Sequence, residues 1–231
     1  MSVIETVSEI TYPDSDGNPM SDSTKQADAM VFLKTNLDAL FEDHADVFVA
    51  MDLLWYPVEG HPEIRVGPDV MLAFGRPKGY RGSYRQWVEG GVAPQVVIEI
   101  LSPGNRFSEM QRKLEFYDRH GVDEYYLYDP DDFAFSVWHR AEPGQPLRLI
   151  HPTESWTSPR MGVRFEASGE GELRVFGPDG AEFQSPLEIR RNLAVVEGMR
   201  DRAEGERDSA LRRSARLAAM LRELGVDPDA V

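Results

Sequence analysis

The chain lacks cysteine, long apolar runs and any excess of positive charge. Its 231 residues include 25 Lys and Arg against 40 Asp and Glu, so the formal net charge is −15, and none of them is cysteine. The absence of cysteine excludes disulfides and thiolate metal sites, and it fits an intracellular protein. The shortage of positive charge argues against a large basic surface for nucleic acid.

No apolar stretch approaches the ~20 residues that a transmembrane helix needs. The first 20 residues are acidic and have no apolar centre, so we expect no signal peptide. We therefore expect a cytoplasmic protein without a membrane span. A hydrophobic content of 41% in a chain of 231 residues predicts one sizeable domain with appendages.

Composition divides the chain into three parts. Residues 1–22, rich in Asp, Ser, Pro and Gly, predict a flexible lead. Residues 23–186 predict the folded domain, and residues 187–231, rich in Arg, Glu and Ala, predict a helical tail. The tail holds nine Arg and nine acidic residues, which leaves 16 basic and 31 acidic residues for the rest of the chain. The whole charge deficit therefore lies before the tail.

The stretch from Pro94 to Pro130 predicts a strand, a helix and a second strand. Val96–Leu101 is an apolar, β-branched run typical of a buried strand. The helix is predicted to begin after an N-cap at Ser108 and to end at Gly121, and Glu124–Tyr128 forms the second strand. A strand–helix–strand unit of this length is a crossover, which predicts an α/β fold.

Further elements flank this unit. Periodicity and turn residues predict a helix over residues 23–43, a strand over 47–58, a buried strand over 70–74, a surface loop over 77–91, a strand over 133–139 and several short strands between 147 and 176.

Two carboxylates stand on otherwise apolar strands, Asp69 and Glu99. Burying an unpaired charge is costly, so each needs a reason. Two such acids meeting at one sheet edge would form an all-oxygen site suited to Mg²⁺ or Mn²⁺. Lys113, on the helix after Glu99, would supply a point charge for phosphate or for the attacking water. Alternatively, Lys113 pairs only with Glu109 one helical turn away.

Structural roles would also explain both acids. Asp69 would cap a turn or the start of its strand. Glu99 would form an ion pair with an arginine of the following segment, either Arg106 or Arg112. These alternatives remain open at the level of the sequence.

A series of motifs resembles the Uma-type restriction endonuclease family, a bacterial group in the PD-(D/E)XK nuclease superfamily. The resemblance runs in order from about Val47 to Trp138, and the end of the tail also resembles tails common in that family. The residues that carry it are Pro68-Asp69, the run from Pro94 to Pro103, Lys113, Tyr117, Gly121-Val122, Glu124-Tyr125-Tyr126 and Asp129-Pro130. It implies a restriction-endonuclease-like core, a mixed sheet flanked by helices, in which Asp69 and Glu99 are the metal ligands.

The chain departs from the superfamily pattern at several positions. The lysine usually found two residues after the second acid is replaced by Leu101, whereas the Uma-type pattern carries a lysine on the next helix, which matches Lys113. Glu109 and Gln95 stand where the family often has Asp, which argues against a catalytic role for either residue.

These observations predict an Mg²⁺- or Mn²⁺-dependent endonuclease acting on DNA. Asp69 and Glu99 would hold the cation, Lys113 would act on water and phosphate, and Arg106 and Arg112 would contact the DNA backbone.

The alternative is a catalytically silent module that assembles through its tail. Apolar residues recur every seven positions from Ala203 to Leu224, although Glu206 and Arg213 interrupt the companion positions. The tail therefore predicts either a coiled coil, which would give a homodimer or higher homo-oligomer, or a solvated helix.

Overall fold

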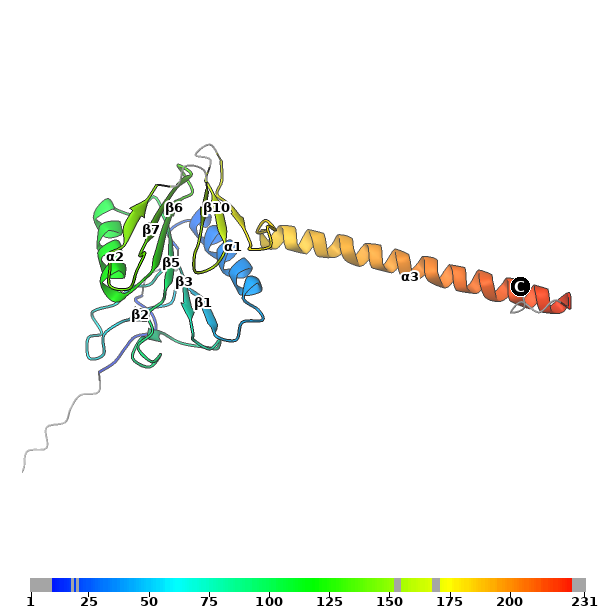
Figure 1. The fold of residues 1–231 in the computed structure, drawn as a ribbon, viewed down its shortest axis with the longest axis horizontal. Helices are drawn as coiled ribbons and strands as arrows, with labels where there is room; N and C mark the ends of the chain where they lie inside the picture. The colour runs from blue at the N-terminus through cyan, green and yellow to red at the C-terminus, as the bar shows by residue number, and fades with distance from the viewer. Residues whose placement is uncertain (1–9, 18, 20, 152–154, 168–170, 226–231) are drawn as a thin grey trace, which may run out of the picture. The chain divides into compact units, whose positions relative to one another are not determined.

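A six-stranded mixed sheet forms the centre of the fold (Figure 1). The computed structural model describes residues 10–17, 19, 21–151, 155–167 and 171–225. In spatial order the strands are β1 (Val47–Met51), β3 (Val70–Phe74), β5 (Val96–Ile100), β6 (Glu124–Asp129), β7 (Ala134–His139) and β8 (Arg148–Ile150). β5 and β6 are parallel and every other neighbouring pair in this sheet is antiparallel.

Helices cover both faces of this sheet (Figure 1). α1 (Thr24–Leu40) buries Met30, Leu33 and Leu37 against one face, where the even-numbered residues of β5 point. α2 (Phe107–His120) packs on the opposite face, which carries the odd-numbered residues of β5. Because alternate residues of a strand point to opposite faces, β5 contributes to both cores, and this explains its continuous apolar sequence.

Two smaller sheets complete the domain. β9 (Ser155–Thr157), β10 (Arg164–Glu166) and β11 (Arg174–Phe176) form an antiparallel sheet whose apolar residues join the core under α1. β2 (Trp55–Tyr56) and β4 (Tyr84–Arg85) form a parallel pair.

The predicted mixed α/β fold, with a sheet flanked by helices and a parallel crossover through α2, is confirmed. Three local predictions are wrong. The segment predicted as a surface loop contains β4, and its Tyr84 is fully buried with its hydroxyl donating to Val92 O at 2.8 Å. The N-cap of α2 is Arg106 in extended backbone rather than Ser108, and the single strand predicted over residues 47–58 is divided into β1 and β2.

The described part of the N-terminal lead contacts the domain. The ring of Tyr12 lies 5.3 Å from that of Tyr56 and 4.9 Å from that of Trp87, measured between centroids. The Tyr56 hydroxyl donates to Pro13 O at 2.6 Å. Residues 1–9, 18 and 20 of the predicted lead lie outside the described residues.

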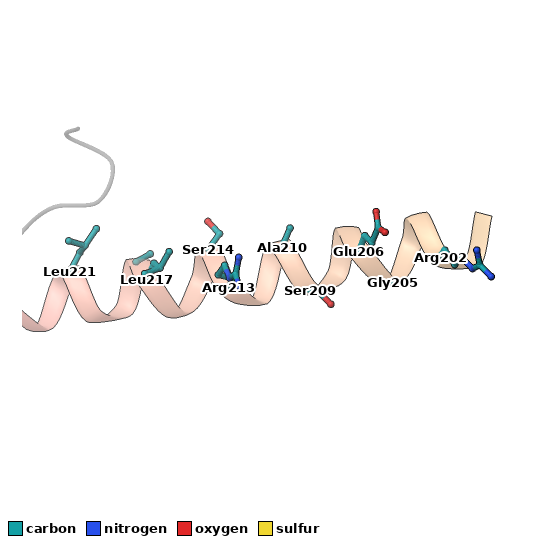
Figure 2. A pocket seen from close by; sticks show the side chains of 10 residues that line it. Arg202, Gly205, Glu206, Ser209, Ala210, Arg213, Ser214, Leu217 and Leu221 are labelled. Carbon is teal, nitrogen blue, oxygen red and sulfur yellow. The ribbon is translucent and has the colours of Figure 1, made fainter. Parts of the chain in front are cut away.

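The residues from Gln184 onward form a second compact unit, which consists largely of α3 (Pro186–Glu223). α3 begins with a capping box, in which Ser185 and Glu188 each accept a backbone N–H of the other. No residue of α3 is buried within the described chain, and Figure 2 shows a shallow hollow along one face of this helix. Among the described residues, no helix combines the length and apolarity that crossing a membrane requires.

Candidate active site

The register of β3 against β5 brings the two predicted acids together. Val70 pairs with Ile98 in this antiparallel ladder, so the next step places Asp69, just before β3, across from Glu99. Directly opposed residues share one face of a sheet, with Cβ atoms about 5 Å apart. The two acids therefore lie side by side at the end of the sheet where β5 leads into α2, with Glu99 reached by Lys113 and Tyr117 of α2 and Asp69 reached by Gln26 of α1. Two like charges in this position repel each other.

Glu99 is held by two side chains from α2. Lys113 Nζ donates to Glu99 Oε2 at 2.8 Å, and the Tyr117 hydroxyl donates to Glu99 Oε1. The carboxylate is 2% exposed, and the lysine side chain is 19% exposed. Lys113 and Tyr117 stand four residues apart on one face of the helix, so a single helical face supplies both donors.

Asp69 is held mainly by the backbone of β5. Its Oδ2 accepts the N–H of Ile100 at 2.7 Å, and Gln26 Nε2 lies 3.3 Å from both carboxylate oxygens. Burial, followed by repulsion from Glu99, raises the pKa of Asp69 to about 7. Lys113 and the hydrogen bonds oppose this rise without cancelling it. Near neutral pH the Asp69 carboxyl is therefore poised between its two protonation states.

Lys113 remains a cation at neutral pH. Burial alone would lower its pKa, but attraction to Glu99, their hydrogen bond and the charge of Asp69 outweigh this effect and leave the pKa raised. A lysine with a raised pKa acts as a hydrogen-bond donor and a positive charge, and it is unsuited to removing a proton from water at pH 7.

Asp52 supports the turn that presents Asp69. Its backbone N–H lies 3.1 Å from Pro68 O and 3.2 Å from Asp69 O, and its φ of 47° is rare for a residue other than glycine. Burial, followed by the charge of Asp16, raises the pKa of the Asp52 carboxyl, while Lys113 opposes the rise.

The structure decides between the alternatives for Glu99. Its cation is Lys113, so the hypothesis that it pairs with Arg106 or Arg112 is wrong. Both arginines are exposed, and Arg112 donates through Nε to Ser108 O. Glu109 contributes to the raised pKa of Lys113 as a nearby charge, but the ion pair is with Glu99.

Gln26 and the hydroxyl of Tyr117 contact the acid pair although neither was predicted as a site residue. Gln26 is 6% exposed and also donates to Ile100 O at 3.1 Å, so it ties α1 to the end of β5. It lies one turn before Met30 on the buried face of α1. A polar residue on an otherwise apolar helix face is the sequence feature that could have indicated its role. Tyr117 was named only among the residues of the family resemblance; its ring packs in the core while its hydroxyl reaches Glu99.

A third buried carboxylate, Glu124, has a structural role. It is completely buried on β6 and accepts hydrogen bonds from the hydroxyls of Tyr126 and Ser158 and from the backbone N–H of Arg160. These donors connect the main sheet to the segment before β10. The contrast with Asp69 is informative, because the Glu124 carboxylate has a full set of donors and faces no second acid in the described structure.

The donor set suits an oxygen-ligated divalent cation. Among the described residues, no group of three or more His, Cys, Asp and Glu side chains could hold a metal ion. Mg²⁺, however, is commonly bound by only one or two carboxylates, completed by water and phosphate. Asp69 and Glu99 fit this requirement, since a cation between them would relieve the repulsion that raises the Asp69 pKa. The hollow of Figure 2 lies on α3 and includes neither acid.

The chain is similar to a solved structure and to a protein family. A crystal structure of a protein from Anabaena variabilis ATCC 29413, described as a putative nuclease belonging to DUF820, matches with a TM-score of 0.45 and 17% identity. The match covers 62% of this chain and 75% of that one. No curated protein matches the chain. The family Uma2, described as "Putative restriction endonuclease", matches residues 9–174, well over half of the 231 residues. The chain therefore belongs to the Uma2 family.

Proposed function

We propose that the chain is a metal-dependent endonuclease that hydrolyses phosphodiester bonds of DNA. The observation that carries this proposal is the pair of opposed strand carboxylates, Asp69 and Glu99, with the Lys113 ammonium group bound to one of them. Membership of the Uma2 family supports a nuclease. We expect the substrate to be DNA and the protein to act in the cytoplasm.

The two acids would hold Mg²⁺ or Mn²⁺. A cation of this kind lowers the pKa of a bound water and stabilises the charge of a phosphodiester. Glu99 is fixed by two side-chain donors, whereas Asp69 is the acid whose protonation state is poised. A cation between Asp69 and Glu99 would offset the repulsion between the two carboxylates, so the pair favours the metal-bound state.

Lys113 would orient the attacking water and bind a phosphate oxygen. Because its raised pKa keeps it protonated, we assign it a role as donor and positive charge rather than as general base. Its ammonium group has three donors, and Glu99 accepts from one of them at 2.8 Å. The remaining donors could reach water and phosphate.

Arg106 and Arg112 would contact the DNA backbone beside this centre. Both are exposed; Arg106 is the N-cap of α2, and Arg112 directly precedes Lys113 in the middle of this helix. Arginine suits phosphate because its planar fork makes two parallel hydrogen bonds. These contacts would position DNA without reading its sequence.

Cleavage of supercoiled plasmid DNA tests the proposal. The wild-type protein should nick or linearise the plasmid with Mn²⁺ or Mg²⁺ and should stop when EDTA is added. Glu99→Gln should be inactive, whereas Glu115→Gln, the same change at an exposed position of α2, should retain activity. A wild-type protein that stays inactive with either metal on plasmid, linear and single-stranded DNA would favour the silent module instead.

A second function, self-association, is supported by α3. Apolar residues occupy every seventh position from Ile189 to Leu224, and those with large side chains are exposed, for example Val196 at 61% and Leu217 at 55%. A stripe of this length is typical of a coiled-coil seam. We propose that a second copy of this chain covers it and gives a homodimer.

The companion positions favour an antiparallel pair. In a parallel dimer Glu206 would face Glu206 and Arg213 would face Arg213, which places like charges in the seam. An antiparallel register centred on Asp208 instead sets each of these long side chains opposite an alanine. The facing pairs are then Val196 with Met220, Met199 with Leu217, Ala203 with Arg213, and Glu206 with Ala210 of a second copy. Large apolar pairs would thus flank a centre in which long and small side chains alternate.

A further inference from the structure

The hydroxyl of Tyr125 is the one buried side-chain polar atom that has no hydrogen-bond partner among the described residues. The residue is 1% exposed and lies on β6. A buried hydroxyl without a partner loses its hydrogen bonds to water and gains none in return, so such a group calls for an explanation.

The strand register places Tyr125 on the same face of the sheet as Glu99. Tyr125 pairs with Val97 in the parallel ladder of β5 and β6, so its side chain lies on the α2 face, as do those of Val97 and Glu99. Its ring centroid is 5.2 Å from that of Tyr117, whose hydroxyl donates to Glu99. Tyr125 is therefore in ring contact with the tyrosine whose hydroxyl is committed to Glu99.

The electrostatics of the site agree with this geometry. Burial, followed by the charges of Glu99 and Asp69, raises the pKa of Tyr125. The phenol therefore stays protonated at neutral pH and is a donor. Its neighbour Tyr126, which points to the other face of the sheet, has its hydroxyl satisfied by Glu124 and by Trp156 Nε1. The hydroxyl of Tyr125 thus differs from those of Tyr126 and Tyr128 on the same strand, each of which has a hydrogen-bond partner.

We propose that Tyr125 is a positioning residue whose hydroxyl donates a hydrogen bond to a water of the hydration shell of the divalent cation held by Asp69 and Glu99. The inference rests on the proposed function, because it requires that cation. In metal-free protein the hydroxyl is unpaired, and metal binding supplies its acceptor. Tyr125 would thus favour the metal-bound state without being a ligand itself.

The substitution Tyr125→Phe separates this role from simple packing. It removes one oxygen atom, keeps the ring in contact with Tyr117 and Trp138, and deletes an unpaired group. The metal-free variant should therefore be at least as stable as the wild type in urea. Its affinity for Mn²⁺ alone, measured by titration calorimetry, should fall roughly tenfold or more, as is typical for the loss of a group that hydrogen-bonds to a metal's surroundings.

Tyr84→Phe is the matched control, because the Tyr84 ring is also fully buried under this face and its hydroxyl is satisfied by Val92 O. It should lower metal-free stability and leave Mn²⁺ affinity unchanged. Equal Mn²⁺ affinity in Tyr125→Phe and wild type would overturn the positioning role while leaving the proposed endonuclease standing. Failure of the wild type itself to bind Mn²⁺ would overturn both. The positioning role would also be overturned if metal-free Tyr125→Phe lost more stability than Tyr84→Phe, since the Tyr125 hydroxyl would then have an acceptor in the metal-free protein.

Discussion

Lys113 Nζ lies 2.8 Å from Glu99 Oε2, although the two residues belong to different elements of the fold. Glu99 lies in the central strand β5, and Lys113 lies two turns into α2. The short loop between β5 and α2 returns the helix across the end of the strand, which brings the ammonium group back to the carboxylate. The residue two positions after Glu99 is the apolar Leu101, so the cation that contacts Glu99 comes from a helix and not from its own strand segment.

Replacing Lys113 by alanine should have opposite effects on stability and on metal response. Glu99 would lose its cation while remaining 2% exposed, so the metal-free protein should be destabilised on the order of 3 kcal/mol. Mn²⁺ should then raise the melting temperature more than in the wild type, because the metal replaces the missing positive charge. Cleavage should nevertheless fall about a hundredfold or more, since the donor to water and phosphate is absent. Thermal melts with and without Mn²⁺, together with single-turnover cleavage, measure all three.

Lys34→Ala is the matched control for this variant, because Lys34 forms an exposed ion pair with Asp38 on α1. It should change stability by less than about 1 kcal/mol and leave cleavage unaffected. Cleavage by Lys113→Ala at the wild-type rate would show that the lysine serves only to neutralise Glu99.

Glu99→Gln should remove the stabilisation that metal provides. Mn²⁺ at a hundredfold excess over its Kd should stabilise the wild type by about 2.7 kcal/mol, through preferential binding to the folded state. The amide is a much weaker ligand, so the variant should show almost none of this gain. Its metal-free fold should persist, because Gln keeps an acceptor for Tyr117. A metal response equal to that of Glu115→Gln would remove Glu99 from the site.

The elements that the sequence predicts correctly are those with a regular local pattern of apolar residues. β5, α2 and β6 follow from an apolar run, an amphipathic repeat and a second apolar run, and the structure confirms the parallel crossover between them. β4 has only two residues and therefore carries no periodicity, so Tyr84 was assigned to a loop despite its burial. Short strands depend on tertiary contacts that a local pattern does not contain.

The partners within the site could not be predicted for a similar reason. Asp69 and Glu99 were singled out because charges on apolar strands are unusual, but their pairing depends on a strand register set across a long connection. Gln26 acts from a helix 43 residues before Asp69 in the chain. The unpaired hydroxyl of Tyr125 is defined by what surrounds it, and no pattern in the sequence encodes that.

The stability of the metal-free protein should depend on pH through Asp69. Its pKa rises from an ordinary 3.8 to about 7 on folding, so the stability that this group contributes is present below about pH 4 and is lost as pH rises toward 7. A difference of three units corresponds to about 4 kcal/mol as an upper bound. Asp69→Asn removes this titration. In urea unfolding with EDTA, the free energy of unfolding of the variant should therefore increase relative to that of the wild type between pH 4 and pH 7. Parallel stability curves over that interval would contradict the raised pKa.

Arg106 and Arg112 should control the salt dependence of DNA binding. Replacing either by alanine removes one phosphate contact, so the slope of log affinity against log salt should become shallower by roughly 0.9. Arg119→Ala, at an exposed position in the last turn of α2, should leave the slope unchanged. Fluorescence anisotropy of labelled duplex DNA in EDTA, in which cleavage is prevented, gives the slopes. A weaker affinity with the wild-type slope would mean that the arginines act on the fold and not on phosphate.

The orientation of the proposed α3 dimer can be read from introduced cysteines, because the chain has none of its own. In the antiparallel register Val196 faces Met220 of a second copy, so the double variant Val196→Cys with Met220→Cys should form covalent dimers under mild oxidation. Val196→Cys alone should not, since its two copies lie far apart along the antiparallel pair.

A parallel dimer would change the outcome for the single variant, because position 196 would then face itself and both the single and the double variant would cross-link. A disulfide within one chain is excluded in either case, since 24 residues of helix separate the two positions by about 36 Å and Cα atoms must come within about 7 Å. Non-reducing gels identify the cross-link, and light scattering on the reduced wild type gives its mass in solution. A wild-type monomer at high concentration, with neither variant cross-linking, would leave α3 as a solvated helix.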